Sequence, residues 1–153
     1  MTITSAICNS FKQEILVEGH NFTNGTDTFK ISLYSSDSAT LNKSTTAYTA
    51  PADGTADPTN TYEVTSTSSG YTTGGNSLTS TTPVLSGDTA CCKFADTSWG
   101  SSASFTARGC LIYNSTNSTK QFVQLILAPT KLSLVELLQS NSQLKQQVTL
   151  LFR

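Results

Sequence analysis

Hydrophobic and polar positions alternate most clearly in the stretch "DTFKISLYS", residues 27–35. One side of an extended chain would carry Phe29, Ile31 and Leu33, and the other side Lys30, Ser32 and Tyr34. A period of two is typical of a strand with one buried face. The pattern therefore predicts a half-buried strand.

A helical pattern precedes this strand in "NSFKQEILVE", residues 9–18. Apolar residues recur there among charged and polar ones, with Ser10 near the N-cap position and Glu14 in the first turn. Gly19 follows as a stop signal, because helices commonly end at glycine. We expect a short helix of about two turns.

The segment from residue 35 to residue 80 is dominated by Ser, Thr, Gly, Asp and Pro, and "APADGTADPTN" marks turns within it. It holds too few apolar residues to fill a core. We interpret it as a long excursion with one short strand near residues 62–67. The string "GYTTGG" at its end indicates tight β turns better than phosphate binding, because no helix pattern follows it.

Short β-prone runs follow at residues 78–83 and 90–94, with an "SGD" turn between them. The string "SASFTARGCLIYN" then predicts a long strand. One side of that strand would carry Phe105, Ala107, Gly109, Leu111 and Tyr113, and the other side Cys110 and Ile112. Short strands separated by turns roughly every ten residues are typical of a β-sandwich or jelly roll.

The end of the chain has a different composition. From residue 121 onward there are six Gln and nine Leu but no Gly, Asp or Tyr. We therefore divide the chain into a β-sandwich domain, residues 1–120, and a C-terminal segment, residues 121–153. As written, this segment predicts an amphipathic helix, in which the apolar residues at close to helical spacing are Leu134, Leu137, Leu138, Leu144 and Val148.

A shifted reading frame is the alternative for this segment. One lost base near Thr119 or Lys120 would produce it, and one translation that the shifted frame permits contains "GTFTIQFP". Alternating strands of this type would close the β-sandwich with a hairpin. The predicted fold class is thus mainly β: a single-domain, β-sandwich or jelly-roll-like fold with a short N-terminal helix and, as written, a C-terminal helix.

The charge balance and the hydropathy of the chain indicate no particular binding partner. Lys plus Arg (9) nearly balances Asp plus Glu (10), so there is no basic footprint for nucleic acid. No run reaches the roughly 18 apolar residues of a membrane span, and the N-terminus lacks a secretion signal. Five Asn sequons, Asn21, Asn24, Asn42, Asn114 and Asn117, are therefore interpreted as chance in a chain rich in Ser, Thr and Asn.

Residues that could support chemistry are few. Four cysteines, Cys8, Cys91, Cys92 and Cys110, lack the spacing of a zinc or redox motif, and we expect buried free thiols. We assign the lone His20 a capping or surface role, since no second histidine exists to share a metal.

Two further candidates have structural explanations. Asp53 and Asp57 provide too few oxygen ligands for calcium and indicate turns instead. Trp99, with Phe94 and Tyr113, could form a sugar-binding platform, but a single Trp more often lies in the core or at a subunit contact. We therefore predict no catalytic, cofactor-binding or metal-binding residue, and a protein that is not an enzyme.

The order of several strings resembles a group of small virion proteins of tailed bacteriophages, including those of cyanobacterial hosts. The strings are "ICNSFKQEIL…HNFT", "DTFKISLY", "SATL…TTAYT", "EVTSTSSGYTTGG", "FADTSW" and "FTARGCLIYN", which cover most of residues 7–114. The resemblance implies a non-enzymatic structural protein of the virion, assembled in the host cytoplasm in many copies. Its partners would be other virion proteins, the major capsid protein above all, and further copies of itself in a homo-oligomer.

Two placements in the particle follow from this resemblance. The first is a decoration or cement protein on the capsid surface, which we favour because the chain has no fibre repeats and no long coiled coil. The second is a tail, baseplate or head-fibre adhesion module. In that case the loops between residues 35 and 80, with Tyr48 and Tyr62, would contact host glycans.

Overall fold

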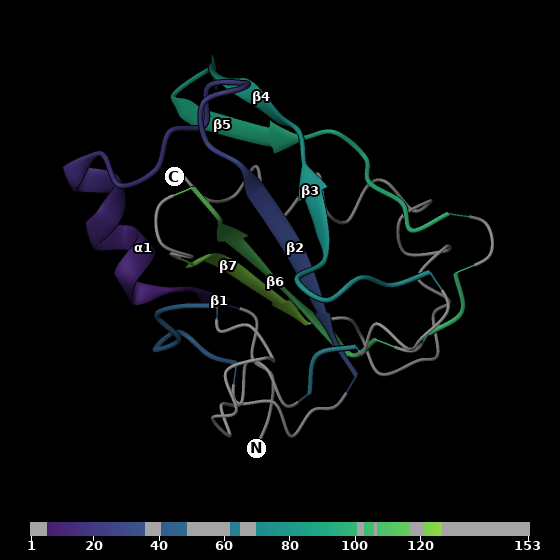
Figure 1. Ribbon diagram of the computed structural model, residues 1–153. Coiled ribbons are helices and arrows are strands. Elements are labelled where there is room, and N and C mark those ends of the chain that lie inside the picture. The colour runs from purple at the N-terminus through teal and green to yellow at the C-terminus, as the bar shows by residue number, and fades with distance from the viewer. Residues whose placement is uncertain are drawn as a thin grey trace.

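A computed structural model describes residues 6–35, 41–48, 62–64, 70–100, 103–105, 107–116 and 121–126. It is mainly β with one short N-terminal helix, as the sequence predicts (Figure 1). The elements are β1 (Ala6–Ile7), α1 (Asn9–Glu14), the 3-10 turn η1 (Ile15–Val17), β2 (Phe29–Tyr34), β3 (Asn76–Leu78), β4 (Ser80–Ser86), β5 (Thr89–Phe94), β6 (Gly109–Asn114) and β7 (Gln121–Ile126). The predicted C-terminal helix lies outside the described residues.

A five-stranded antiparallel sheet with the order β1-β7-β6-β2-β3 forms the body of the protein. At its centre β2 pairs with β6 along its whole length, from Phe29 opposite Asn114 to Tyr34 opposite Gly109. β7 pairs with both β6 and β1. The first six residues of the C-terminal segment are therefore a strand of this sheet in the reading frame as written.

The alternation predicted for β2 is confirmed, but the strand is buried on both faces. Phe29, Ile31 and Leu33 lie in the main core, while Ser32 and Tyr34 are fully buried on the other side. A second cluster covers that other side, and it consists of Tyr34, Leu41, Tyr48, Leu111 and Tyr113. The prediction of a half-buried strand was wrong because tyrosines bury their rings against the sheet and keep their hydroxyls hydrogen-bonded.

The predicted excursion thus contributes to both cores. Leu41 and Tyr48 enter the second cluster, and Val64 and Tyr71 enter the main core. In the predicted strand near residues 62–67, the structure describes one isolated bridge, between Tyr34 and Glu63, and residues 65–67 lie outside the described part.

The N-terminal helix is confirmed, with different ends. Cys8 occupies the N-cap position without a side-chain hydrogen bond, and Ser10 lies inside the helix, so its predicted capping role was wrong. At the other end it is Glu18 that takes the left-handed conformation, with φ 56°. The N–H of Gly19 donates to the carbonyl of Glu14 at 2.7 Å, and a Cβ at Gly19 would lie 2.9 Å from that oxygen. A side chain at Gly19 would crowd the Glu14 carbonyl, so the return of the chain at this end of the helix requires glycine.

β6 is shorter than the strand predicted from "SASFTARGCLIYN". It begins at Gly109 because its partner β2 ends opposite, at Tyr34. Within β6 the faces are as predicted, with Cys110 and Ile112 in the main core and Leu111 and Tyr113 in the second cluster. Phe105 and Ala107, which were predicted on the side of Leu111, pack against the main core instead. The predicted runs at residues 78–83 and 90–94 correspond to the β3–β4 region and to β5.

Candidate functional site

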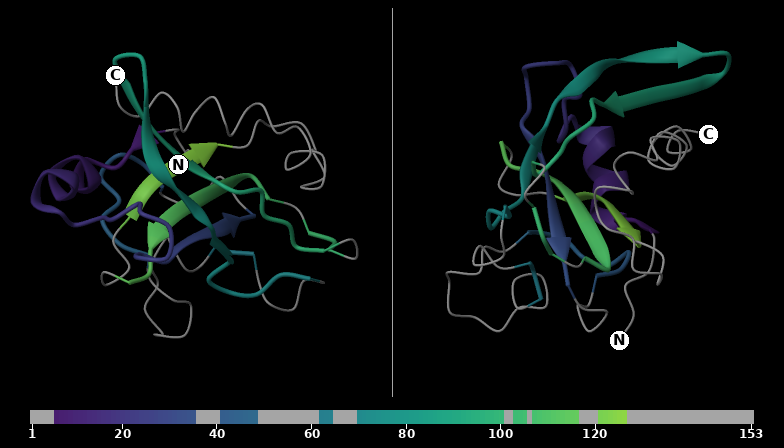
Figure 2. Two further views of the ribbon diagram at one scale, coloured as in Figure 1. Left: turned by 90° about the horizontal axis from the view of Figure 1, so that it is seen from above. Right: turned by 90° about the vertical axis from the view of Figure 1, so that its right-hand side faces the viewer.

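An exposed two-stranded ribbon extends from the body of the protein, formed by β4 and β5 (Figure 2). β4 follows β3 after the single residue Thr79. β3 pairs with the body strand β2, whereas β4 pairs only with β5 among the described strands. Gly87 and Asp88 close the ribbon, with Gly87 at φ 61°, which suits a two-residue hairpin turn with glycine first. The predicted "SGD" turn is confirmed.

Pro83 divides the ribbon into an inner and an outer half. The register shifts between Thr81 and Val84, where three steps along β4 match two along β5, from Lys93 to Cys91. Proline has no N–H to donate to a ladder and is found in strands at edges and bulges. A bulge also strengthens the local twist, so the outer half can turn away from the body.

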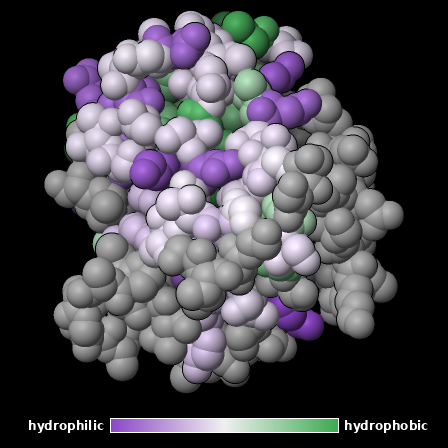
Figure 3. Space-filling view, turned by 45° about the vertical axis from the view of Figure 1, so that its right-hand side comes forward, coloured by the Kyte–Doolittle hydropathy of each residue, from purple (hydrophilic) through white to green (hydrophobic). Residues whose placement is uncertain are grey.

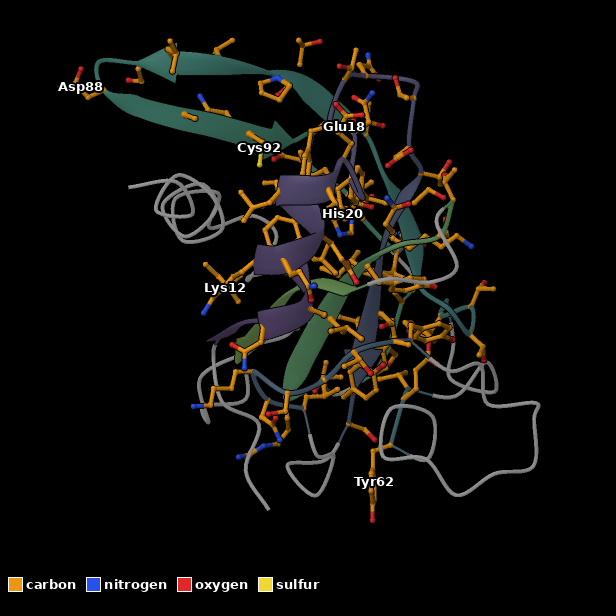
Figure 4. All side chains as sticks on the ribbon, turned by 90° about the vertical axis from the view of Figure 1, so that its left-hand side faces the viewer. Lys12, Glu18, His20, Tyr62, Asp88 and Cys92 are labelled. Carbon is orange, nitrogen blue, oxygen red and sulfur yellow. The ribbon has the colours of Figure 1, made fainter. Side chains whose placement is uncertain are left out.

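The ribbon is anchored at its base and exposed towards its tip. Phe94 packs on Phe29 with ring centroids 5.4 Å apart, and Cys92 is buried in the main core. Further out, Val84 is 57% exposed and Leu85 77% exposed. Figure 4 shows Cys92 near the base and Asp88 at the far end, and Figure 3 shows hydrophobic surface at the top of the molecule, where the ribbon lies. The two exposed apolar side chains near its tip make the ribbon a candidate contact surface.

His20 is buried, so the predicted surface role was wrong. Its ring lies against Phe11, with centroids 5.0 Å apart, and its Nε2 lies 2.8 Å from the Glu14 carboxylate. Its Nδ1 lies 3.3 Å from the amide nitrogen of Asn114, which also donates to Asp27 at 2.6 Å. These contacts tie the helix to the end of β6 and to the loop before β2.

The orientation of Asn114 assigns the protons in this cluster. The backbone N–H of Thr116 can only donate, and it donates to the Asn114 side-chain oxygen at 2.9 Å. The amide NH₂ of Asn114 therefore faces His20, whose Nδ1 must accept and whose Nε2–H donates to Glu14. The sequon at Asn114 is buried and engaged in hydrogen bonds, which agrees with its interpretation as chance.

A second buried polar cluster is centred on Glu63, which is 4% exposed. One carboxylate oxygen accepts hydrogen bonds from the Tyr71 hydroxyl at 2.7 Å and the Gly74 N–H at 2.6 Å, and the other accepts from the Tyr48 hydroxyl at 2.9 Å. Burial raises the pKa of Glu63, and the three hydrogen bonds to the carboxylate oppose that rise. The same burial, with Glu63 nearby, raises the pKa of Tyr48 and Tyr71.

Sequence reasoning missed Glu63, because a lone carboxylate among Ser, Thr and Gly is typical of an exposed loop. The signal that could have revealed it is the tyrosine content of the same segment, at Tyr48 and Tyr71, since buried phenols need acceptors. The turn prediction for "GYTTGG" is confirmed: Gly70, Gly74 and Gly75 all have positive φ. These turns bring the Gly74 N–H to the carboxylate.

The aromatic residues considered for a sugar-binding platform do not come together. Trp99 and Phe94 pack against the main core, whereas Tyr113 belongs to the second cluster on the opposite face of the sheet. Trp99 packs beside Tyr71 and Phe105, which confirms the core interpretation. Tyr48 is only 7% exposed, and Tyr62 is partly buried against the second cluster, although its side chain points outward (Figure 4). Asp53 and Asp57 lie outside the described residues.

The four cysteines are buried thiols that form no disulfide, as predicted: Cys8, Cys91, Cys92 and Cys110. Burial raises the pKa of Cys8 and of Cys92 to about 11. These two thiols stay protonated at neutral pH, and the protonated form is a poor nucleophile.

The described residues include neither a candidate metal site nor a membrane-spanning helix. Among those residues no group of three or more His, Cys, Asp or Glu side chains is placed to hold a metal ion. Within the same ranges no helix has the length and hydropathy to cross a membrane. No family model, curated protein or solved structure matches the chain. The features that bear on function are therefore the ribbon and the two polar clusters.

Proposed function

We propose that the protein is a non-enzymatic structural subunit of a tailed-bacteriophage particle that decorates or cements the capsid surface. The observation that carries the proposal is the exposed β4–β5 ribbon with Val84 and Leu85 near its tip. A two-stranded hairpin is marginally stable by itself, and its apolar side chains gain free energy when a neighbour covers them. Such an arm suits a subunit whose contacts are completed on assembly.

The polar clusters support a structural role over a catalytic one. Both carboxylate oxygens of Glu63 accept hydrogen bonds from other groups of the protein. The His20 side chain is fully buried between Glu14 and Asn114. Neither cluster presents an acid, base or nucleophile to a ligand. Both join segments far apart in sequence, which stiffens the body that carries the ribbon.

Repetition explains how a small contact surface can be sufficient. One ribbon buries little area, but many copies on a symmetric particle bind with an avidity well above that of each contact. The proposal therefore predicts weak binding to isolated partner proteins and strong retention on assembled particles.

Particle binding by ribbon variants tests this function. Recombinant protein would be added to particles of the encoding phage that lack it, and the bound fraction measured after sedimentation. Replacing Val84 and Leu85 with Thr keeps β propensity but removes the apolar contact, and retention should fall at least about tenfold. Leu16→Gln is the matched control, since Leu16 is 83% exposed but lies outside the ribbon. Failure of the unaltered protein to bind would overturn the proposal.

Peptide mass spectrometry of purified particles gives an independent test. Peptides of this chain should occur in many copies per particle. Those after Asn117 also decide the reading frame: "LSLVELLQSNSQLK" establishes the segment as written, and a "GTFTIQFP"-like peptide establishes the shifted frame. Particles that contain neither would contradict the virion assignment.

A further inference from the structure

An Asn–Gly pair lies at the tip of the loop that joins η1 to β2. The sequence has nine Asn residues, and Asn24 is the one that precedes a glycine, Gly25. The backbone N–H of Thr26 donates to the carbonyl of Thr23 at 3.1 Å, and Gly25 has φ 81°, as the third position of a type II turn requires. All four residues of this turn are exposed.

The two central residues of the turn have few constraints. Among the described residues, none forms a hydrogen bond with the Asn24 side chain or with the Gly25 N–H. A Cβ at Gly25 would meet nothing within 4 Å, so open space surrounds the backbone there. The base of the loop is held separately, since the N–H of Asn21 donates to the Asp27 carboxylate at 2.8 Å. The tip can therefore change its backbone angles without disturbing the body of the protein.

An asparagine followed by glycine is chemically labile for a steric reason. The backbone nitrogen of the following residue can attack the side-chain carbonyl carbon, Cγ, and close a five-membered ring. A side chain on that following residue hinders the attack, whereas glycine has none and reaches the required backbone angles easily. A helix, a strand or a hydrogen bond to the side-chain amide restrains the same movement. The reaction is therefore favoured in an exposed turn.

The other described asparagines lack this combination of neighbour and surroundings. Four have side chains that are hydrogen-bonded to other groups of the protein, and the fifth lies in α1. They are, respectively, Asn21, Asn42, Asn76 and Asn114, and Asn9. None of the five precedes a glycine.

We propose that Asn24 is a site of spontaneous deamidation through a cyclic imide. Hydroxide removes the proton of the Gly25 N–H, and that nitrogen forms a bond with Cγ of Asn24. The bond from Cγ to Nδ2 breaks, and the side-chain nitrogen takes a proton from water and leaves as ammonia. A water molecule then opens the ring. Opening at the side-chain carbonyl gives aspartate, and opening at the backbone carbonyl gives isoaspartate.

The modification changes the surface beside the base of the ribbon. Phe22, immediately before the turn, packs against Phe94 of β5 with ring centroids 6.3 Å apart. Deamidation adds a negative charge to a chain whose formal net charge is −1, and isoaspartate also lengthens the backbone by a methylene group. Because the base of the loop is held separately, the modified protein should stay folded. The reaction requires no partner, so the inference is independent of the proposed function.

Ageing of the full chain tests the proposal. Folded protein would be incubated at pH 7 and at pH 9 and then digested with trypsin at pH 6, which limits further reaction. One tryptic peptide, residues 13–30, contains both Asn21 and Asn24, so fragmentation of a single peptide supplies the internal control. Asn24 should react at least about tenfold faster than Asn21, and faster at pH 9 than at pH 7, because hydroxide starts the reaction. Peptide chromatography should resolve aspartate and isoaspartate products.

Gly25→Ala is the matched variant. The added methyl group meets no other part of the described structure but hinders the attacking nitrogen, so deamidation of Asn24 should slow by at least about tenfold. Thermal unfolding shows whether the variant is folded. The same comparison in urea, where both chains are unfolded, should give the same order of rates and does not depend on the stability of the variant.

Three results would overturn the inference. Asn24 that reacts in urea but stays intact in the folded protein would show that the turn protects it. Equal rates at Asn21 and Asn24, or at Asn24 with and without Gly25→Ala, would show that glycine does not promote the reaction. A product that contains aspartate without isoaspartate would exclude the cyclic imide.

Discussion

The carboxylate of Glu63 accepts a 2.7 Å hydrogen bond from the hydroxyl of Tyr71 in the interior of the protein. The same hydroxyl accepts a hydrogen bond of 3.0 Å from the backbone N–H of Leu33, in the central strand β2. Tyr71 therefore links the buried side chain of Glu63 to the sheet. This link holds Glu63 and Tyr71 against the body, and it makes the protein sensitive to pH and to the loss of single hydroxyls.

Stability should fall as pH rises through the pKa of Glu63, and Glu63→Gln should remove that fall. Burial raises the pKa of Glu63 in the folded protein above its value of about 4.3 in the unfolded chain, so the folded state holds the proton more tightly. The contribution of the Glu63 proton to the free energy of unfolding is complete below the pKa of the unfolded state. It is lost as pH rises through the pKa of the folded state. Urea denaturation between pH 4 and pH 8 measures it, with the exposed Glu18→Gln as control. If the free energies of unfolding of the unaltered protein and of Glu63→Gln differed by the same amount at every pH, the prediction would be contradicted.

Tyr71→Phe should lower the free energy of unfolding by about 2–4 kcal/mol, since it leaves both the Glu63 carboxylate and the Leu33 N–H without this partner. The control is Tyr62→Phe, because the Tyr62 side chain points outward (Figure 4). Denaturant unfolding at pH 7 compares the two variants. Equal losses would show that the Tyr71 hydroxyl contributes nothing to the buried cluster.

Gly75→Ala should be far more destabilising than Gly25→Ala. Both glycines have positive φ, 72° and 81°, so the conformational cost of a side chain is similar. A Cβ at Gly75 would overlap the carbonyl group of Ile31 in β2, whereas at Gly25 nothing lies within 4 Å. We expect losses of about 3–5 kcal/mol and about 1–2 kcal/mol, respectively. Similar melting temperatures for the two variants would contradict the close approach of β2 and Gly75.

Asn114→Asp should destabilise the protein by about 2–4 kcal/mol, because it places a second carboxylate beside Asp27, 2.6 Å from the present amide nitrogen, in a buried site. The substitution keeps the shape of the side chain, so the loss reports charge and hydrogen bonding. Asn24→Asp is the exposed control. Thermal unfolding at low and high pH should show the Asn114→Asp variant recovering as the pH is lowered and the new carboxylate gains a proton.

The four thiols should react slowly with an aromatic disulfide reagent in the folded protein and all at once in denaturant. All four cysteines are buried and form no disulfide, and the pKa of Cys8 and Cys92 is raised to about 11. Thiolate is the reactive form, so labelling at pH 8 depends on transient opening. Fast labelling of more than one thiol without denaturant would contradict the burial of these residues.

Local patterns in the sequence identified the elements that depend on neighbouring residues. The alternation in residues 29–34, the two faces of residues 109–114, the glycine turns of "GYTTGG" and the burial of the cysteines are all local or compositional signals, and the structure confirms them. The strand lengths were not predictable in the same way. β6 begins where β2 ends, and that register depends on pairing between segments roughly 80 residues apart in the chain.

The sequence by itself determined that this is a mainly β chain, with a short N-terminal helix and cysteines that avoid water. Only the tertiary structure decided which polar residues are buried and which apolar residues are exposed. Glu63 and His20 enter the interior because distant segments supply their hydrogen-bond partners, and Leu85 stays outside because β4 continues past the sheet that β3 joins. The physical reason is that periodicity fixes the side of a strand on which a residue lies, whereas burial depends on what the rest of the chain packs against that side.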